Sequence, residues 1–237
     1  MGSRSKIEWT NDTWNPWYGC HKVSDGCLNC YMYRDMRRFK RGDPNIVHFS
    51  SDAIFKAPYK FKGPYVFVNS WSDFFISEAD VARLEAWHII RKTPHLTYQI
   101  PTKRPERILS CLPYDWGDGY PNVWLGVSAE DQSTWNERVP LLLKVPARVR
   151  FVSIEPMLQY IDIQNMIPEC NGDPELYPLD WIIVGGESGH NARFMRPHWA
   201  RIIKMECERM GVSFFMKQMT GRAPIPGDLK VREFPII

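Results

Sequence analysis

Six short apolar segments recur along the chain from Tyr65 onward, and all are rich in β-branched and aromatic residues. They are YVFVNS at 65–70, LTYQIPT at 96–102, NVWLGVS at 122–128, VRFVSIE at 149–155, WIIVGGE at 181–187 and VSFFMKQ at 212–218. Their hydrophobicity is nearly continuous rather than alternating, which is typical of parallel strands buried on both faces. The pattern predicts six strands, and IEWT at 7–10 or nearby residues would supply an earlier one.

Amphipathic segments between these strands predict helices. In the segment 77–92, Ser77 is placed to cap a helix N-terminus. The apolar face of that helix would consist of Val81, Leu84, Trp87 and Ile90.

Two further helices are expected. In the segment 196–211, Pro197 suits the first helical turn and Gly211 suits the stop. The apolar stripe of this helix would consist of Trp199, Ile203, Cys207 and Met210. A third helix, within 128–145, is predicted to end near Pro140 or to resume after it.

Strands that alternate with helices favour a parallel α/β fold. We predict a single domain over residues 1–237, built as a parallel (β/α) barrel or partial barrel, with a doubly wound open sheet as the alternative. The irregular segment 161–180 is expected to be a surface insertion.

The predicted strands end in polar residues, and active sites of parallel α/β folds lie at those carboxyl ends. Because this polarity is repeated from strand to strand, we expect one functional site at that edge of the sheet. The residues that follow the strands are Asn69, Ser70 and Asp73; Thr102, Lys103 and Arg104; Ser128, Glu130 and Asp131; Ser153 and Glu155; Gly185, Gly186, Glu187 and Ser188; and Lys217 and Gln218.

Composition is ordinary for a globular protein, with 44% hydrophobic and 24% charged residues. The net charge of +3 is too small to establish nucleic-acid binding, although the basic run RDMRRFKR at 34–41 leaves that option open. The chain has no apolar window of about 18 residues and no secretory signal, so we expect a cytoplasmic protein without a membrane partner. In that compartment, disulfides explain the cysteines poorly, and metal binding or catalysis explains them better.

Three of the six cysteines are close together in sequence. Cys20, Cys27 and Cys30 follow the spacing C-x6-C-x2-C within the segment 18–31. A structural zinc ion needs four ligands, and no second C-x2-C supplies the fourth, although His21, Asp12 or a distant residue could. The other cysteines, Cys111, Cys170 and Cys207, are scattered, and Cys207 is expected in the core.

Three cysteines suit a metal site that keeps one coordination position open. Cysteines usually bind all four irons of a [4Fe–4S] cluster, so three would leave one iron free for an exogenous ligand. Radical enzymes that use S-adenosylmethionine (SAM) require this arrangement, because the free iron chelates the amino and carboxylate groups of SAM. We favour this interpretation over zinc, which lacks an evident fourth ligand. We also favour it over a catalytic thiol, because no single cysteine is set apart with an obvious histidine partner.

Several segments closely resemble a phage-associated protein family of uncertain function that has a three-cysteine N-terminal motif. They are KIEWTNDTWNPWYGCHKVSDGCLNCY, VFVNSWSDFF, TYQIPTKRPERI, NVWLGVSAEDQ, RFVSIEPML, WIIVGGESGHNARFM and VSFFMKQ, in order from Lys6 to Gln218. This family is similar to radical SAM proteins with a partial or complete (β/α) barrel. The resemblance implies that Cys20, Cys27 and Cys30 bind the cluster and that Tyr31 covers it or packs near the adenine of SAM.

The chain also departs from the usual radical SAM pattern. Those enzymes mostly show C-x3-C-x2-C with an aromatic before the last cysteine, where this chain has Asn29. Their Gly-Gly-Glu motif follows the second strand, whereas Gly185, Gly186 and Glu187 follow a late one. Sequence order therefore does not give these three the amino-binding role, although the glycines allow a ligand to approach the backbone closely.

Other positions are candidates for contacts with SAM or substrate. Asn69, Ser70 and Asp73 follow the strand after the cysteine loop and are the positional candidates for SAM binding. Ser128 and Glu130 are placed to hydrogen-bond the ribose, and Glu155 to receive the SAM amino group or act on substrate. Lys103, Arg104 and Lys217 are expected to bind a substrate carboxylate or phosphate. No catalytic residue is assigned.

The sequence thus predicts an iron–sulfur, SAM-dependent radical enzyme that receives electrons from a donor. The phage context of the resemblance favours a nucleic-acid or nucleotide substrate, to be modified or repaired. The alternative is a non-catalytic module, stabilised by zinc or an iron–sulfur cluster, that binds nucleic acid or a protein partner. An enzyme of the hydrolase or nucleotide-binding type is disfavoured, because the chain has no nucleophile elbow, P-loop or G-x-G-x-x-G.

Overall fold

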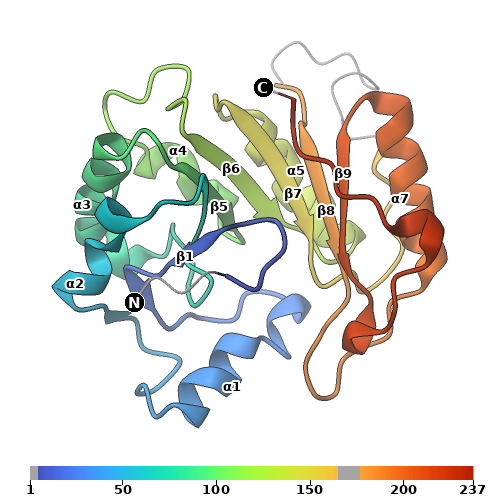
Figure 1. Ribbon diagram of the computed structural model, residues 1–237, viewed down its shortest axis with the longest axis horizontal. Helices are drawn as coiled ribbons and strands as arrows, with labels where there is room; N and C mark the ends of the chain where they lie inside the picture. The colour runs from blue at the N-terminus through green and yellow to red at the C-terminus, as the bar shows by residue number, and fades with distance from the viewer. Residues whose placement is uncertain (1–4, 165–176, 237) are drawn as a thin grey trace.

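A seven-stranded parallel sheet curls into a half-barrel in the computed structural model, which describes residues 5–164 and 177–236. Figure 1 shows the sheet, with helices α3, α5 and α7 around its outside. The strands are β1 (Asp12–Trp14), β4 (Tyr65–Val68), β5 (Thr97–Thr102), β6 (Val123–Ser128), β7 (Val149–Ile154), β8 (Trp181–Gly185) and β9 (Ser213–Gln218). The six predicted strands are confirmed, and the early strand lies just after IEWT.

The strands are hydrogen-bonded to one another in chain order, from β1 to β9, without a reversal. A doubly wound sheet reverses direction at a switch point, so the predicted partial barrel is confirmed and the open-sheet alternative is wrong. Because every crossover has the same hand, the covering helices fall on one side of the sheet. The other, concave side is left for the chain termini and the cysteine loop.

Helices of very different lengths connect the strands. A two-stranded antiparallel ribbon, β2 (Trp17–Tyr18) with β3 (His48–Phe49), lies outside the main sheet. The α-helices are α1 (Tyr31–Arg38), α2 (Asp52–Phe55), α3 (Asp80–Lys92), α4 (Ile108–Cys111), α5 (Gln132–Leu143) and α7 (Pro197–Met210).

The predicted apolar face of α3 is half wrong. Trp87 and Ile90 are buried, but the side chains of Val81 and Leu84 are 84% and 70% exposed. The buried face instead includes Arg83, whose guanidinium donates to the carbonyl oxygens of Phe74 and Ile76. Ser77 does not cap α3, because it begins a 3-10 turn over Ser77–Ala79 that precedes the helix.

The other two helices match their predictions more closely. Helix α7 begins at Pro197 and ends before Gly211, which takes the left-handed conformation at φ +69°. Its stripe residues Ile203 and Cys207 are fully buried. Helix α5 does not end at Pro140 but continues to Leu143, since Leu142 and Leu143 are buried and hold its last turn on the sheet.

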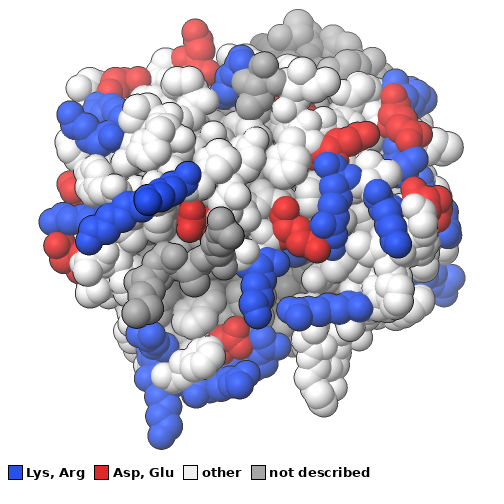
Figure 2. All heavy atoms as spheres, viewed as in Figure 1, with Lys and Arg blue, Asp and Glu red and all other residues white. Residues whose placement is uncertain are grey.

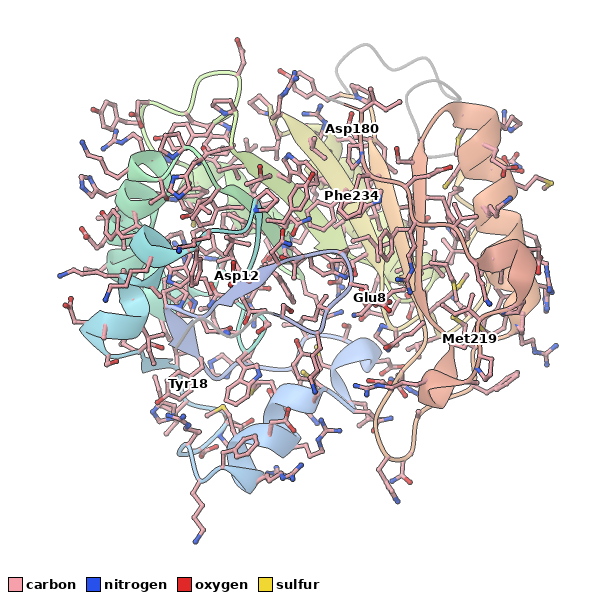
Figure 3. All side chains as sticks on the ribbon, in the orientation of Figure 1. Glu8, Asp12, Tyr18, Asp180, Met219 and Phe234 are labelled. Atoms are coloured by element: carbon pink, nitrogen blue, oxygen red, sulfur yellow. The ribbon has the colours of Figure 1, made fainter. Side chains whose placement is uncertain are left out.

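Aromatic side chains fill the concave side of the half-barrel toward the amino ends of the strands. We call this part of the concave side its lower level. Trp181 lies at the centre of this concave aromatic cluster, with ring centroids 5.8 Å from Trp124 and 6.3 Å from Trp9. Phe234, near the C-terminal end, covers Trp181 at 5.2 Å (Figure 3). The cluster consists of Trp9, Trp124, Val149, Phe151, Trp181, Ile183 and Phe215. The half-barrel is therefore a packed core at this level and not a channel.

Further along the same strands, the concave side becomes polar. Side chains alternate between the two faces of a strand, so Ser128 shares the face of Trp124, and Ser153 shares the face of Phe151. Ser128 and Ser153 are register partners on β6 and β7. The aromatic cluster thus closes the half-barrel from below and leaves a polar level at the carboxyl ends.

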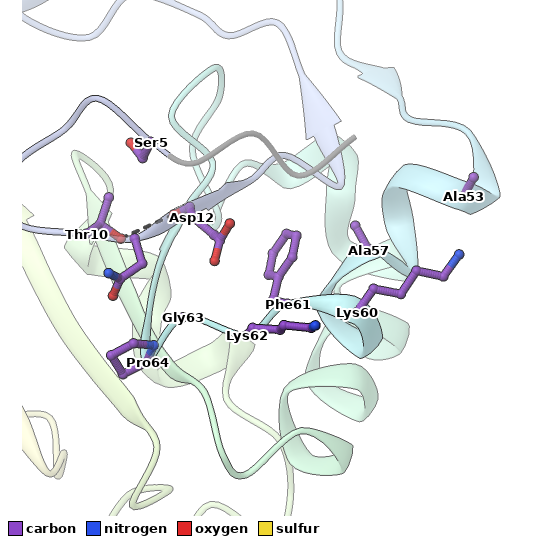
Figure 4. A pocket seen from close by; sticks show the side chains of 11 residues that line it. Ser5, Thr10, Asp12, Ala53, Ala57, Lys60, Phe61, Lys62, Gly63 and Pro64 are labelled. Carbon is purple, nitrogen blue, oxygen red and sulfur yellow. Dashed lines mark hydrogen bonds between the residues drawn. The ribbon is translucent and has the colours of Figure 1, made fainter.

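A surface pocket lies at the other end of the sheet (Figure 4). It surrounds the amino ends of β1 and β4, and Asp12, Phe61 and Lys62 are among the residues that line it. Because it is at the pole opposite the polar strand ends, it is not part of the candidate site below.

Two sequence predictions concern other parts of the chain. The predicted insertion at 161–180 lies largely outside the described residues, as does Cys170. Within the described residues, no helix is both long and apolar enough to cross a membrane.

We expect Gly126→Ala to destabilise the protein. An added Cβ at this position on β6 would lie 2.5 Å from the ring of Phe151 on β7. Overpacking of this kind costs about 1–3 kcal/mol, to be measured as a lower denaturant midpoint in equilibrium unfolding. Gly227→Ala is the control, because its added Cβ would meet nothing within 4 Å. Equal midpoints for the two variants would contradict the packing described here.

Candidate functional site

The three-cysteine loop and helix α1 lie across the end of the half-barrel to which the strands point (Figure 1). Cys27 ends a 3-10 turn over Asp25–Cys27, and its carbonyl accepts a 3.3 Å hydrogen bond from the amide of Cys30. Cys30 in turn is the N-terminal cap residue of α1. This tight turn keeps two of the three thiols together, as the C-x2-C spacing predicts.

Gly19 fixes where the loop begins. Its φ is +90°, and a Cβ there would collide with the carbonyl oxygen of Ile46. The Gly19 amide donates to the carbonyl of Trp71 at 2.9 Å, and the Cys20 amide donates to the carbonyl of Pro44 at 3.0 Å. Cys20 is thereby placed beside the segment that follows β4, although it is far from that segment in sequence.

The Cys20 thiol lies beside a buried ion pair. The Arg104 guanidinium is 3.8 Å from Cys20 Sγ and donates to Asp73 Oδ2 at 3.2 Å. Burial and the charge of Asp73 raise the pKa of the Cys20 thiol to about 12, although Arg104 partly opposes them. The free thiol is therefore protonated at neutral pH, and a metal that binds it must displace the proton.

The three thiols share one neighbourhood around Tyr33. Burial, followed by the charges of Cys20, Cys27 and Cys30, raises the pKa of the Tyr33 hydroxyl to about 12. That hydroxyl donates to the carbonyl oxygen of Cys20. Burial and the charge of Cys27 also raise the pKa of the Cys30 thiol. The structure thus brings together the three cysteines that the sequence singled out.

Asp73 organises the side of the site near β4 and β5. Its carboxylate accepts from the Thr102 hydroxyl at 2.7 Å and from the Phe75 and Lys103 amides at 2.9 Å, in addition to Arg104. These four donors occupy both oxygens, so Asp73 holds the ends of β4 and β5 together and orients Arg104.

Glu130 fastens the cysteine loop to the sheet from below. Its side chain is fully buried, and Lys103 Nζ and Arg138 Nη1 both lie 3.0 Å from Oε2. The other oxygen, Oε1, accepts from the Ser24 hydroxyl and from the Gly26 amide at 3.2 Å. Ser24 and Gly26 lie between Cys20 and Cys27, so this contact fixes the longer gap of the motif.

Opposing effects set the protonation of Glu130. Burial alone would raise the pKa of its carboxyl, but Lys103, Arg138 and the Ser24 hydroxyl outweigh that effect and hold the pKa below its usual range. Gly26 is required at the contact, because an added Cβ would lie 2.7 Å from the Glu130 carboxylate. The Glu130 carboxylate, for which a ribose contact was predicted, thus already accepts from four donors of the protein itself: Ser24, Gly26, Lys103 and Arg138.

Glu187 holds the other side of the loop. It accepts from the Asn29 side chain at 3.1 Å and from the Arg193 amide at 2.7 Å, and it forms an ion pair with the Arg193 guanidinium. Arg193 also donates to the carbonyl of Asp25 at 2.9 Å. Burial would raise the pKa of Glu187, but these donors hold it below its usual range.

Glu155 faces the polar level of the concave side, between the loop and the aromatic cluster. It accepts from the Ser153 hydroxyl at 3.0 Å and pairs with Lys217 Nζ at 2.8 Å. Gly185 lets this carboxylate approach β8, since an added Cβ would lie 2.5 Å from Glu155 Oε1. Burial, then the charges of Cys30 and Glu155, raise the pKa of Tyr31. The structure thus places Glu155 and Lys217 near the last cysteine and Tyr31.

The remaining predicted residues lie around the same mouth. The Tyr31 hydroxyl donates to the Ser70 carbonyl at 2.7 Å, so Tyr31 reaches from α1 to the end of β4. Asn69 is buried with φ +57°, and its Oδ1 has no hydrogen-bond partner within the described part of the chain. Gly186 is packed against Thr220, with an added Cβ 2.6 Å from the Thr220 amide nitrogen.

The part of the chain that the structure describes holds no preformed site for a single metal ion. Within residues 5–164 and 177–236, no group of three or more His, Cys, Asp and Glu side chains is placed to hold a metal ion. In a four-iron cluster each cysteine binds a different iron, so the sulfurs lie farther apart than the ligands of one ion. The donor set fits such a cluster in chemistry: three thiols from one loop, in one neighbourhood, with cations close to Cys20 and Cys30.

Comparison with known proteins shows the family of the chain. Residues 4–226 match the model of a family described as "Protein of unknown function (DUF5131)". The chain belongs to this family. No curated protein and no solved structure was found to match it. The match covers every strand and the cysteine loop, so the arrangement above belongs to the part of the chain that defines the DUF5131 family.

Sequence reasoning missed several residues that hold the site together. They are Ser24, Asn29, Arg138 and Arg193. Arg138 left a signal, because it is a charge within the buried stripe of α5, among Trp135, Val139 and Leu142. A charge in such a stripe calls for a buried partner of opposite sign. No comparable signal identifies Ser24, Asn29 and Arg193, which are ordinary loop residues in sequence.

We expect Glu130→Gln to destabilise the protein by about 3–5 kcal/mol at neutral pH, since the change leaves the buried Arg138 and the partly buried Lys103 without their partner. A carboxyl whose pKa is lowered on folding contributes stability above its unfolded pKa. The contribution of Glu130 should therefore be complete above about pH 4.5 and decrease as the pH falls below that value.

Denaturant unfolding of both proteins from pH 7 to pH 4 checks this, with the exposed Glu137→Gln on α5 as control. A difference between wild type and Glu130→Gln that grows on acidification would contradict the role given to Glu130.

Proposed function

We propose that this protein is an iron–sulfur, SAM-dependent enzyme of the radical type and a divergent relative of the radical SAM proteins. One observation carries the proposal: three thiols of one loop share a neighbourhood at the carboxyl ends of a parallel half-barrel. Parallel α/β folds place their active sites at this end. The family match establishes neither this chemistry nor the phage association that the sequence resemblance suggests.

Cys20, Cys27 and Cys30 would hold a [4Fe–4S] cluster. When bound, such a cluster with one iron free of protein ligands supplies the electron that cleaves the sulfonium of SAM reductively. An external electron donor is needed, so the loop has to lie near the surface. Cys20 and Cys30 are indeed half-buried, whereas Cys27 is buried.

The protein's own residues would position the reactants. Glu130 and Glu187 hold the loop at two points, one on each side of Cys27. These contacts fix the positions of the thiols, so the loop does not have to be stable by itself. Arg104 donates toward Cys20 Sγ, and hydrogen bonds to cluster sulfurs raise reduction potentials. The aromatic cluster below excludes water from the interior of the half-barrel.

Glu155 is the residue best placed to receive the amino group of SAM. It lies on the concave side near Tyr31 and Cys30, and its one described cation partner is Lys217. Exchange of that ammonium for the SAM ammonium would keep the carboxylate paired. Tyr31, which spans the mouth from α1 to Ser70, would then cover the bound molecule.

Anaerobic reconstitution with iron and sulfide tests the cluster. We expect a brown protein with about four irons per chain, and loss of the colour in Cys27→Ala. Cys111→Ser is the matched control, because Cys111 lies on α4 next to Arg83 and Arg107 and should not affect the iron count. Reduction in the presence of SAM should release 5′-deoxyadenosine.

A colourless protein that binds one zinc ion would instead support the alternative of a metal-stabilised binding module. Failure to form any cluster under strictly anaerobic conditions would overturn the proposal.

Glu155→Gln should separate the cluster from SAM binding. We expect a normal iron count, because the hydrogen-bond and ion-pair partners of Glu155 among the described residues are Ser153 and Lys217, which lie outside the loop. We also expect at least tenfold weaker binding of SAM, because a charged hydrogen bond is worth about 1.5–3 kcal/mol. Calorimetric titration of the reconstituted protein measures this. Unchanged affinity for SAM would remove Glu155 from the SAM site.

A further inference from the structure

A strongly basic segment of the chain lies directly beside the candidate site. Five basic residues and one acidic residue fall between Tyr31 and Arg41, a net charge of +4, whereas the whole chain carries +3. The net positive charge of the chain therefore belongs to one helix and the turn that follows it, and the rest of the chain sums to −1. Figure 2 shows Lys and Arg side chains around the end of the molecule where α1 lies.

Most of these cations are available to a ligand. Arg34 pairs with Asp35, but Arg37, Arg38, Lys40 and Arg41 are exposed and take part in no ion pair within the described residues. A solvated helix face usually intersperses both signs of charge, as α7 does with its Lys204–Glu208 and Arg209–Glu206 pairs. Here Asp35 pairs with Arg34, and Asp43 is near enough to Arg37 to feel its charge without forming an ion pair. We call the surface formed by Arg34, Arg37, Arg38, Lys40 and Arg41 the α1 basic surface.

An aromatic column stands within the α1 basic surface. The Phe39 ring is 55% exposed, and it stacks on Trp71 with ring centroids 6.4 Å apart and an interplanar angle of 15°. The Arg38 guanidinium lies over the Phe39 ring at 5.5 Å from its centroid. Proteins that bind single-stranded nucleic acid use aromatic rings and arginine planes as stacking platforms beside cations that contact phosphates.

The position of the column relates it to the cysteine site. Helix α1 begins directly after Cys30, and Tyr31 and Phe39 are at its two ends. At about 1.5 Å per residue they are about 12 Å apart, a length of about three to four stacked nucleotides at about 3.4 Å each. A strand on α1 that stacks a base at Phe39 would thus reach the mouth beside Tyr31.

Two other acidic partners fit the surface less well. A membrane surface would need a continuous apolar helix face to insert. Met32, Tyr33 and Met36 of α1 are buried within the protein, and the two exposed rings, Tyr31 and Phe39, stand at opposite ends of the helix and do not form such a face. An acidic peptide would pair with the cations, but its carboxylates would not stack on the Arg38–Phe39–Trp71 column.

We infer that the α1 basic surface binds single-stranded nucleic acid and delivers one nucleotide to the cysteine site as substrate. The binding stands on the surface alone, whereas its role in delivering a substrate rests on the function proposed above.

Fluorescence anisotropy with a labelled single strand of DNA tests the binding, at salt concentrations between about 50 and 200 mM. Contacts to four cations predict that log K falls with log salt at a slope of about −3 for a single strand. In Arg37→Gln/Arg38→Gln the slope should become shallower by about 1.4, with weaker binding. The matched control is Lys144→Gln/Arg148→Gln, two exposed cations near the opposite end of the sheet, which should leave the slope unchanged.

Phe39→Ala separates stacking from charge. We expect about tenfold weaker binding with the salt slope preserved, because the ring makes no ionic contact. Circular dichroism of each variant shows whether the fold is intact. A slope near zero for the wild type, or equal binding of a matched duplex, of polyglutamate or of anionic vesicles, would overturn the inference.

The two proposals fail in different ways. A protein that forms a cluster and cleaves SAM but does not bind single strands would contradict only this inference. A protein that binds single strands through the α1 basic surface but never forms a cluster would contradict the proposed function, and with it the delivery of a substrate, but not the binding of nucleic acid.

Discussion

The candidate site depends on one buried carboxylate. Glu130 is at the end of β6, is fully buried, and is shared between Lys103 of the β5 end, Arg138 of α5 and the loop residues Ser24 and Gly26. A buried charge is tolerated only when its partners are in place. This single requirement therefore links the sheet, its covering helix and the cysteine loop, and none of the three can shift without exposing an unpaired charge.

The same constraint explains the unusual spacing of the cysteines. Six residues separate Cys20 from Cys27, and within them Ser24 and Gly26 contact Glu130. On the other side, Asn29 and Arg193 connect the loop to Glu187. A long loop normally costs conformational freedom, but here it is held by tertiary contacts on both sides.

The concave side of the half-barrel has two levels, one apolar and one polar. Below, aromatic rings pack around Trp181 and supply much of the apolar burial. Above, the same strands and their ends present Ser153, Glu155 and Lys217, and both Ser153 and Lys217 contact the Glu155 carboxylate, close to Tyr31. Every second residue of a strand faces the concave side. A change from aromatic to polar residues along this series, toward the carboxyl end, is enough to produce the two levels. A ligand is thus met by polar groups while the interior stays closed.

The sequence by itself determined the six strands from Tyr65 onward and the parallel α/β class, and it singled out the three cysteines of one loop. It left a complete barrel, a partial barrel and an open sheet as possibilities, and the strand order decided between them. Continuous apolar segments define buried parallel strands, and the C-x2-C turn is local, so both can be read without knowing what packs against them. The sequence did not determine which face of α3 is buried. Val81 and Leu84 are apolar but exposed, whereas Arg83 is buried because carbonyl oxygens of the preceding loop accept from it.

Only the tertiary structure decided what the polar strand ends do. From sequence, Asp73, Glu130 and Glu187 were all candidates for ligand contacts. In the structure Asp73 and Glu130 have both oxygens occupied by the protein itself, and Glu187 holds Asn29 and Arg193. The donors come from segments that are distant in sequence, and the energy of a buried charge depends on those donors. Spacing along the chain could therefore place these carboxylates at one edge, but could not assign them their partners.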